Sequence, residues 1–187
     1  PVIFTNNSST YSLLKTLVDL NYKPKAYVDI RDIKKIEKET KELLSNYNIP
    51  FYPKSEIEGC EGTKEIRKVI VRTKKDKITK IKASMLCISG GLNPDIHLFT
   101  QSKGLVKWDD KILTFKPEKS FQNTITIGSV SGNFNFEKLV NEINNKLSFK
   151  ETNNIKVDLK ISGVQNFEIE EIWETKNLSK SLWSKSF

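Results

Sequence analysis

The sequence contains few of the residues from which proteins build metal centres and thiol redox sites. Its 187 residues include one histidine, one methionine and two cysteines. His97 alone cannot make a multi-histidine metal site, and Cys60 and Cys87 form neither a C-x-x-C pair nor any other metal-binding spacing. We therefore expect no bound metal ion, no dithiol chemistry and two reduced thiols, as is usual in the cytoplasm.

Long apolar runs and a signal peptide are also missing, so we predict no membrane association and a cytoplasmic location. The net charge of +8 is compatible with nucleic-acid binding. However, the lysines are scattered, and those of residues 34–42 alternate with glutamates. Aromatic residues do not interleave with them, as a surface that stacks bases would require. We therefore expect no nucleic-acid partner.

The two ends of the sequence suggest a piece of a longer polypeptide. The chain starts without Met, directly in the apolar run Val2-Ile3-Phe4, and its last residues include the large apolar Leu182, Trp183 and Phe187. We expect flanking sequence on both sides.

The first fifty residues follow a β-α-β-α-β pattern. Strands are predicted at residues 2–4, 26–28 and 49–52. Apolar residues spaced by threes and fours predict a helix around residues 13–21 and a second at 33–47, the latter with Asp32 as its N-cap. This alternation predicts an α/β fold with a parallel sheet and right-handed crossovers.

The pattern changes after residue 50. A β-meander is predicted at 66–73 and 78–83, followed by a core strand at 85–88. Further predicted elements are a hairpin at 108–115, a buried strand at 124–127, an amphipathic helix at 136–147 and a strand-like segment at 155–161.

A glycine turn after the strand at 85–88 is the most informative local feature. Gly90 and Gly91 can bring backbone N–H groups close to a ligand because neither has a Cβ. Pro94 fixes the direction in which the chain leaves and biases Asn93 away from helix. Open α/β folds bind nucleotides at such turns on the carboxyl edge of a sheet, although many such turns are only turns.

The first β-α turn, in contrast, has lost the dinucleotide fingerprint. Its window, residues 5–10, contains no glycine, and the side chains of Thr5, Asn6 and Asn7 should block a pyrophosphate. Yet Asp29 ends the second strand, where an acid would hold ribose hydroxyls. We interpret this as a degenerate nucleotide site, in which the polar turn serves to cap the following helix.

Several groups of residues follow one another in an order typical of a known family. They are Phe4-Thr5-Asn6-Asn7-x-Ser9-x-Tyr11, Val28-Asp29-x-Arg31, Ser89-Gly90-Gly91-Leu92-Asn93-Pro94-x-x-His97-Leu98-x-x-Gln101-Ser102, Trp108-Asp109, and Gly128 before an amphipathic helix. This series resembles the α subunit of heterotetrameric sarcosine oxidase. That subunit is similar to the pyridine-nucleotide disulfide oxidoreductases, in which an NAD-type domain is inserted into an FAD-type domain.

The resemblance implies a domain organisation. Residues 1–87 would be a Rossmann-like, three-layer inserted domain with a degenerate NAD-binding site. Residues 88–147 would be the returning segment of the first FAD/NAD-type domain. Residues 148–187 would lead toward a C-terminal domain outside this chain.

The resemblance also implies the cofactors. Ser129 stands where FAD enzymes carry an aspartate that binds the flavin ribitol, and in this family the α subunit holds NAD there. Gly90, Gly91, Asn93, Gly128 and Ser129 would then contact NAD. The family's FAD lies on the β subunit and its FMN at the α/β boundary, so this chain alone would bind neither flavin. The implied partners are β, γ and δ subunits.

No nucleophile, general base and orienting group can be assembled from this sequence, and we assign no catalytic residue to it. The expected function is a non-catalytic nucleotide-binding scaffold within a flavin-dependent oxidase of sarcosine or another secondary amine. Two alternatives stay open: a fragment of another FAD/NAD-dependent amine dehydrogenase or disulfide-reductase-like enzyme, and a purely structural interaction module.

Overall fold

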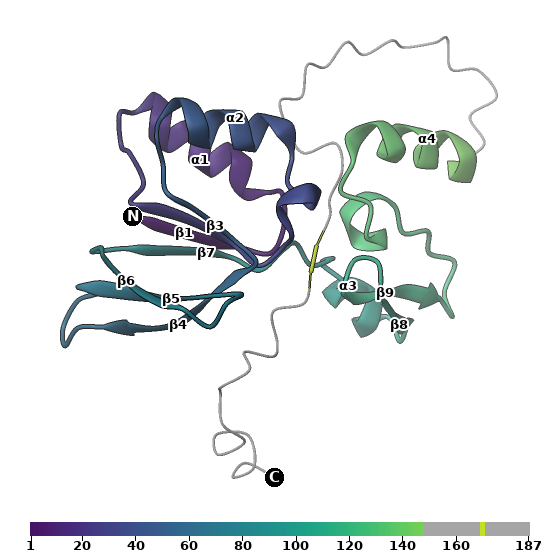
Figure 1. The fold of residues 1–187 in the computed structure, drawn as a ribbon. Coiled ribbons are helices and arrows are strands. Elements are labelled where there is room, and N and C mark those ends of the chain that lie inside the picture. Colours follow the sequence, from purple (N-terminus) through teal and green to yellow (C-terminus); the bar gives the residue numbers. More distant parts are fainter. Residues whose placement is uncertain (148–168, 171–187) are drawn as a thin grey trace. The chain divides into compact units, whose positions relative to one another are not determined.

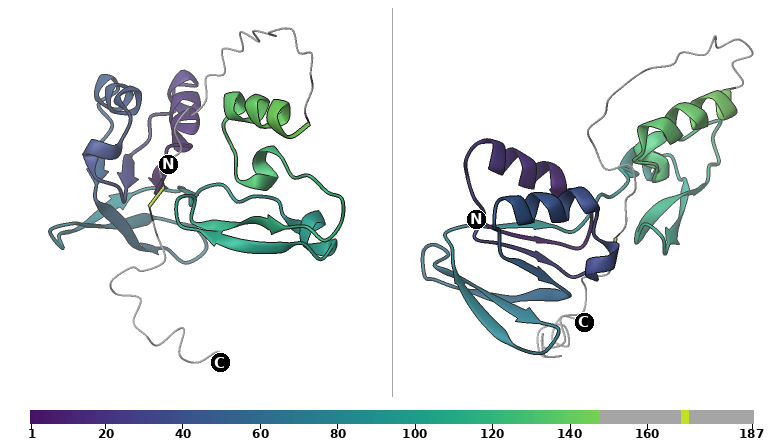
Figure 2. Two further views of the ribbon diagram at one scale, coloured as in Figure 1. Left: turned by 90° about the vertical axis from the view of Figure 1, so that its right-hand side faces the viewer. Right: turned by 45° about the horizontal axis from the view of Figure 1, so that its top comes forward.

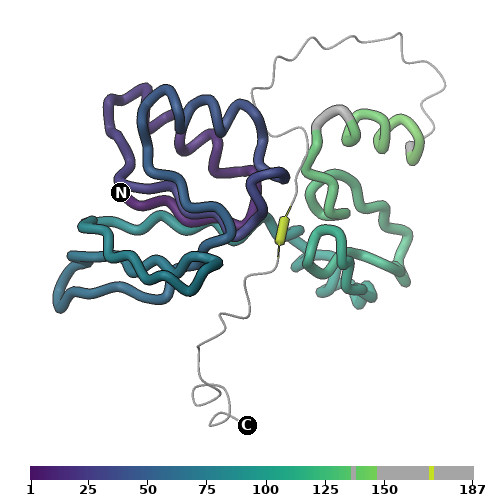
Figure 3. The backbone as a smooth tube through the Cα atoms, in the orientation of Figure 1, coloured from purple at the N-terminus to yellow at the C-terminus, as the bar shows by residue number. Residues whose placement is uncertain are grey.

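The computed structural model describes residues 1–147 together with residues 169 and 170 (Figure 3). These residues divide into two compact units. Unit 1 contains residues 1–91 with 169 and 170, and unit 2 contains residues 92–147. The sequence places the boundary of its two predicted domains a few residues earlier, after residue 87.

Unit 1 is built on a four-stranded parallel sheet with strand order β3-β2-β1-β7. Its strands are β1 (Val2–Thr5), β2 (Ala26–Asp29), β3 (Phe51–Pro53) and β7 (Leu86–Ser89). Helix α1 (Thr10–Asp19) connects β1 to β2, and α2 (Lys38–Asn46) lies between β2 and β3. The predicted β-α-β-α-β order and the parallel sheet are therefore confirmed.

Helices cover one face of this sheet and a second sheet covers the other (Figures 1 and 2). Successive strand residues point to opposite faces, so Ile3 and Tyr27 pack against Leu14 of α1 and Leu44 of α2. On the opposite face, an apolar cluster joins the parallel sheet to the antiparallel sheet. Its buried members are Val2, Phe4, Ala26, Val28, Val69 and Val71. These three layers match the predicted Rossmann-like domain.

The antiparallel sheet contains β4 (Ser55–Glu61), β5 (Lys68–Thr73) and β6 (Ile78–Lys82). Strands β5 and β6 correspond to the predicted meander, but β4 was not predicted. Its sequence mixes charged residues with Gly59 and lacks a clear alternation, and the pairing is interrupted by a bulge between Ile57 and Gly59. Hydrogen bonding to β5 therefore decides its conformation more than its own propensity does.

The predicted helix at 33–47 is broken in two. A 3₁₀ helix, η1 (Ile33–Lys35), begins after Asp32, whose carboxylate accepts the Lys34 N–H at 2.9 Å. Extended backbone at Ile36 and Glu37 separates η1 from α2. This break lets Ile36 enter the core while Glu37 reaches Ser8 and Arg31.

Strand β7 is a sheet edge rather than a fully buried core strand. Ile88 is 65% exposed, and Met85, immediately before the strand, is 56% exposed. The core strand predicted at 85–88 is therefore present, and Leu86 and Cys87 pack against the core, but the expectation of core burial is wrong for Met85 and Ile88. Only one side of β7 has a partner strand, β1, among the described residues.

Unit 2 is smaller and less regular. Its elements are α3 (His97–Gln101), β8 (Leu105–Asp109), β9 (Thr114–Lys119), the 3₁₀ helix η2 (Gly128–Ser131) and α4 (Phe136–Leu147). The predicted hairpin is present, and Trp108 meets Phe115 across it with ring centroids 5.2 Å apart. The predicted helix at 136–147 is confirmed as α4.

The predicted strand at 124–127 is not formed. These residues have no regular secondary structure, and Ile125 is 54% exposed. An apolar run becomes a strand only when another strand hydrogen-bonds to it, and in the described part of the chain none does. The strand-like segment at 155–161 and most of the extension at 148–187 lie outside the described residues.

Candidate functional site

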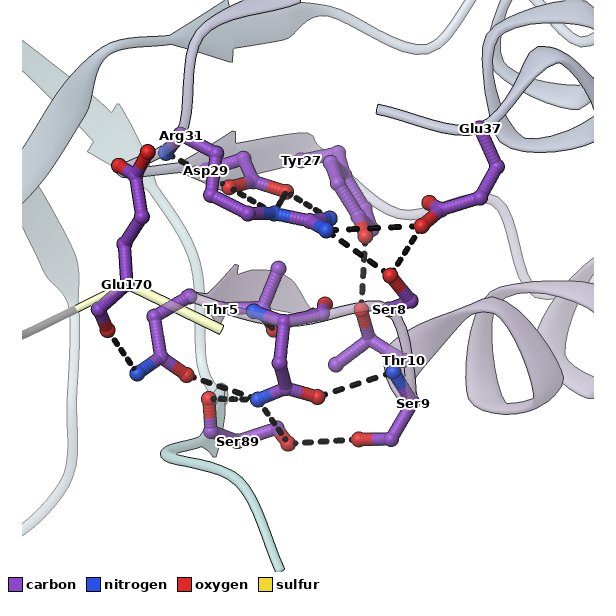
Figure 4. A network of polar contacts seen from close by, with 12 residues as sticks. Thr5, Ser8, Ser9, Thr10, Tyr27, Asp29, Arg31, Glu37, Ser89 and Glu170 are labelled. Carbon is purple, nitrogen blue, oxygen red and sulfur yellow. Dashed lines mark hydrogen bonds and ion pairs between the residues drawn. The ribbon is translucent and has the colours of Figure 1, made fainter. Parts of the chain in front are cut away.

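The carboxyl edge of the parallel sheet gathers four of the predicted site residues. Strands β1, β2 and β7 end at Thr5, Asp29 and Ser89, which lie opposite one another in register. Asn6 and Asn7 follow Thr5 in the turn to α1. Figure 4 shows Thr5 and Asp29 at this edge together with Ser89, which the sequence reasoning did not select.

The β1–α1 turn is held by its own side chains. Thr5 Oγ1 donates to the Asn7 carbonyl at 2.9 Å and accepts the Asn7 N–H at 3.1 Å. The Asn7 amide group donates to Asn6 Oδ1 at 2.7 Å and to the Ser89 carbonyl at 3.1 Å. Asn7 is completely buried and Asn6 is 3% exposed. Side chains thus fill the space that a glycine-rich turn would leave open.

The prediction that the side chains of this turn cap α1 is wrong. Ser9 is the N-cap of α1, but its side chain makes no hydrogen bond to the helix. Instead, Asn7 Oδ1 accepts the Ser9 N–H at 2.9 Å, and Ser9 Oγ lies 3.0 Å from Ser89 Oγ. Asn7 and Ser9 thus tie the turn to Ser89 at the end of β7 instead of capping the helix.

Asp29, expected to hold ribose hydroxyls, is instead buried and bound to Arg31. Its carboxylate accepts the Arg31 backbone N–H at 2.9 Å and the Arg31 Nη2 at 2.9 Å, with further contacts from Nε. Both side chains are completely buried. Burial raises the pKa of Asp29 above its usual value, and the hydrogen bonds from Arg31 oppose that rise. The pair forms in a bend that follows β2, where the Asp29 carboxylate accepts the N–H of the residue two positions on, as aspartate side chains do in turns.

Arg31 also connects the turn to the segment before α2. Its Nη1 donates to Ser8 Oγ at 2.9 Å and lies 3.5 Å from Glu37 Oε1, while the Ser8 hydroxyl donates to the same carboxylate (Figure 4). Sequence reasoning did not assign Arg31 to the site. The signal that could have found it is the Asp-x-Arg spacing at the end of β2.

Residues 169 and 170 lie against this same edge. Ile169 pairs with Asn7 as an antiparallel bridge, and the Glu170 N–H donates to the Asn6 carbonyl at 3.0 Å. The Asn6 side-chain amide donates in turn to the Glu170 carbonyl, and the Glu170 carboxylate pairs with Lys35. No local sequence signal indicates a contact between residues 164 positions apart.

This edge does not fit a dinucleotide. Close approach of a pyrophosphate requires glycines in the β1–α1 turn, whereas here Asn6, Asn7 and Ser8 are nearly or completely buried. The acid at the end of β2 is already paired with Arg31. We therefore derive no nucleotide contact from Thr5, Asn6, Asn7 or Asp29.

The other predicted site residues fall into the two units. Gly90 and Gly91 are the last two residues of the continuous part of unit 1, residues 1–91. Gly91 has a left-handed backbone with φ of 111°. Nothing lies within 4 Å of the position that a Cβ would take on Gly90. Asn93 and Ser129, in unit 2, are exposed.

Gly128 has a partner that the sequence did not reveal. Its N–H donates to Glu142 Oε2 at 3.1 Å. The Glu142 carboxylate also accepts hydrogen bonds from three side chains: Ser131 at 2.8 Å, Asn133 at 3.2 Å and Lys146 at 2.7 Å. Burial alone would raise the pKa of Glu142, but these bonds lower it to about 2. Glu142, a residue of α4, thus binds the turn around η2 to that helix.

Groups suited to metal or thiol chemistry do not gather in residues 1–147 and 169–170. No cluster of three His, Cys, Asp or Glu side chains there could hold a metal ion. Cys60 and Cys87 are free thiols on different sheets, and His97 is exposed at the start of α3. None of the helices in the described part of the chain has the length and apolar character needed to cross a membrane.

Comparisons with known proteins agree with the predicted family and fold. No protein-family model matches the chain. A stretch of 53 residues, 28% of this chain, is 36% identical to sarcosine oxidase subunit alpha from Corynebacterium sp. (strain U-96). The same subunit from strain P-1 is 34% identical over 55 residues. In both cases the matched stretch spans only 6% of the relative's length.

Two solved structures are similar to this chain in fold, one of them with a TM-score above 0.5. A bacillithiol disulfide reductase from Staphylococcus aureus matches with a TM-score of 0.52 and 10% identity, over 70% of this chain and 42% of that one. A thioredoxin reductase from T. acidophilum matches with a TM-score of 0.46 and 12% identity, over 70% and 47% of the two chains. The first of these likenesses confirms the α/β fold class.

Proposed function

We propose that this chain is part of the α subunit of a flavin-dependent oxidase of sarcosine or a related secondary amine. In this proposal it supplies a nucleotide-domain scaffold and subunit contacts rather than catalytic groups. The stretch that is similar to two sarcosine oxidase α subunits supports the enzyme class. The likeness in fold to a disulfide reductase supports the nucleotide-domain architecture.

The observation that carries the scaffold role is the closed carboxyl edge of unit 1. Its turn is filled by buried asparagines, and its acid is paired with Arg31. Residues 1–87 would therefore support the subunit without holding a nucleotide of their own.

Nucleotide contact is assigned instead to Gly90, Gly91, Asn93, Gly128 and Ser129, together with polypeptide outside this chain. Gly91 has a positive φ that glycine adopts readily, and nothing lies within 4 Å of the position that a Cβ would take on Gly90, so the backbone there is open to close approach by a ligand. The Gly128 N–H already binds Glu142, and a methyl group of Leu139 fills the space that a Cβ would take. In this proposal Gly128 therefore contributes the shape of the turn that carries Ser129 and not a hydrogen bond.

The test is the nucleotide content of the full-length subunit purified with its partners. Gly91→Val should remove most of the NAD released on denaturation, because a β-branched residue disfavours φ of 111° and would displace the backbone. Asn6→Ala, the control at the closed edge, should keep the full NAD content. The reverse pattern would show that the two sites are wrongly assigned. Absence of nucleotide from the unaltered complex would favour the purely structural module.

A second measurement concerns residues 1–187 alone. Titration with NAD in a calorimeter should give no binding or only weak binding, since the turn after β1 lacks glycine. A micromolar dissociation constant, about −8 kcal/mol, would contradict the closed edge.

A further inference from the structure

We infer that the carboxyl edge of the unit 1 sheet is a binding site for an acidic segment of the same chain, at Ile169 and Glu170. This segment lies where the fold would otherwise present a dinucleotide site. The inference rests on the geometry of unit 1 and does not depend on the proposed oxidase function.

Backbone hydrogen bonding is the first argument. Ile169 pairs with Asn7 in antiparallel fashion, and the Glu170 N–H donates to the Asn6 carbonyl at 3.0 Å. The Asn6 side-chain amide returns a hydrogen bond to the Glu170 carbonyl. A polypeptide that binds through its main chain in this way resembles a strand added to an exposed edge.

The burial of Asn6 gives the second argument. Asn6 is 3% exposed, and its main-chain carbonyl and its amide nitrogen both bond to Glu170. Its Oδ1 accepts from Asn7 at 2.7 Å. A buried asparagine needs partners for these groups, and the segment provides two of them. A side chain at this position instead of glycine therefore both blocks a pyrophosphate and recognises a peptide.

Charge complementarity is the third argument. The Glu170 carboxylate pairs with Lys35. Four of the seven residues at 168–174 are glutamates. The one described glutamate of this segment, Glu170, thus meets a cation at the edge, and the two opposite charges favour its docking there.

Hydrogen–deuterium exchange of residues 1–187, resolved to single amides, tests the inference. The Glu170 amide should exchange at least about tenfold more slowly than its intrinsic rate, because it is hydrogen-bonded to Asn6. Asn6→Leu keeps the main-chain carbonyl that accepts the Glu170 N–H but removes the side-chain amide that bonds to the Glu170 carbonyl. It should therefore weaken the docking of the segment and speed exchange at Glu170 at least about threefold. Asn46→Leu, a matched change at the exposed last residue of α2, should leave it slow.

Two further measurements keep the result interpretable. The amides of Ile3 and Tyr27 report whether the sheet is still folded in Asn6→Leu. If that variant does not fold, charge reversal replaces it: Lys35→Glu should speed exchange at Glu170, and Lys35→Glu combined with Glu170→Lys should restore protection. Millimolar NAD should change none of these rates.

Three results would overturn the inference. One is an intrinsic exchange rate at Glu170 in the unaltered chain. Another is full protection of Glu170 in a folded Asn6→Leu or Lys35→Glu variant. The third is faster exchange at Glu170 on addition of NAD, which would make the edge a nucleotide site. Because no readout uses amine oxidation, failure here is distinguishable from failure of the proposed function.

Discussion

Replacing Glu142 with glutamine is expected to destabilise unit 2 at neutral pH and to have little effect near pH 2. The carboxylate accepts hydrogen bonds from the Gly128 N–H, Ser131, Asn133 and Lys146, and its side chain is 16% exposed. Glutamine keeps the shape but loses the charge and one acceptor oxygen. The backbone N–H of Gly128 or one of the side-chain donors would then lose its partner.

The magnitude follows from the pKa. A fall from 4.5 to about 2 in the folded protein corresponds to about 3 kcal/mol at 1.36 kcal/mol per pKa unit. Lys146 is 42% exposed, so solvent screening reduces its share and we expect a loss of about 1–3 kcal/mol. Because the folded pKa is lowered, this stability is present above the unfolded pKa near 4.5 and is lost as the pH falls toward 2.

Urea unfolding followed by Trp108 fluorescence measures this effect. Trp173 and Trp183 are first replaced by phenylalanine, so that the signal comes from unit 2 alone. At pH 7, Glu142→Gln should lower the urea midpoint by about 1 M. Glu118→Gln is the matched control: its side chain is 48% exposed and pairs with Lys107 at 3.5 Å, so it should cost less than about 0.5 kcal/mol.

The pH dependence shows whether the charge of Glu142 or its packing causes the loss of stability. The difference between the parent protein and Glu142→Gln should shrink steadily from about pH 5 to about pH 2. A difference that does not change with pH would show that the glutamine variant acts through packing. A loss at pH 7 no larger than that of the control would show that the four hydrogen bonds do not stabilise the carboxylate.

Three other substitutions test the fold by urea unfolding. Arg31→Met should lower the free energy of unfolding by about 3–5 kcal/mol because it leaves the Asp29 carboxylate buried without a counter-charge. Adding Asp29→Asn should recover part of that loss, and no recovery would argue against a charge effect. Leu14→Ala, at a fully buried position of α1, should lower the free energy of unfolding by about 2–5 kcal/mol. Leu20→Ala, at a position 62% exposed, should change it by no more than about 0.5 kcal/mol. Equal losses would contradict the packing of α1. Gly128→Ala should destabilise unit 2 by about 1–3 kcal/mol, since φ is 70° and a Cβ would lie 2.9 Å from a methyl carbon of α4; an unchanged midpoint would show that this turn relaxes freely.

Much of unit 1 was predictable because its signals are local. Apolar periodicity located β1, β2, α1 and the two meander strands β5 and β6, and the alternation of strands with helices indicated the parallel sheet. The strand predicted at 124–127 is not formed, because its signal is local but strand formation is not. A strand depends on a neighbour as well as on its own residues, and the described part of the chain provides none.

The candidate site also has one property that the local sequence indicates and others that depend on distant contacts. The absence of glycine from residues 5–10 is enough to predict a turn that cannot receive a pyrophosphate, since the requirement is steric and local. Which groups occupy that edge instead was decided only by the tertiary structure. Asp29 turns to Arg31, Asn7 to Ser89, and Asn6 to Glu170.

The sequence by itself therefore determined the α/β class, the order of most elements in unit 1 and the loss of the dinucleotide fingerprint. These depend on side-chain periodicity and on steric rules that act within a few residues. The tertiary structure alone decided the edge position of β7, the break before α2, the hydrogen bonds that the Glu142 carboxylate accepts and the contact of Ile169 with Asn7. Each of these depends on a hydrogen bond or packing partner that is distant along the chain or on another element, and a local pattern does not specify that partner.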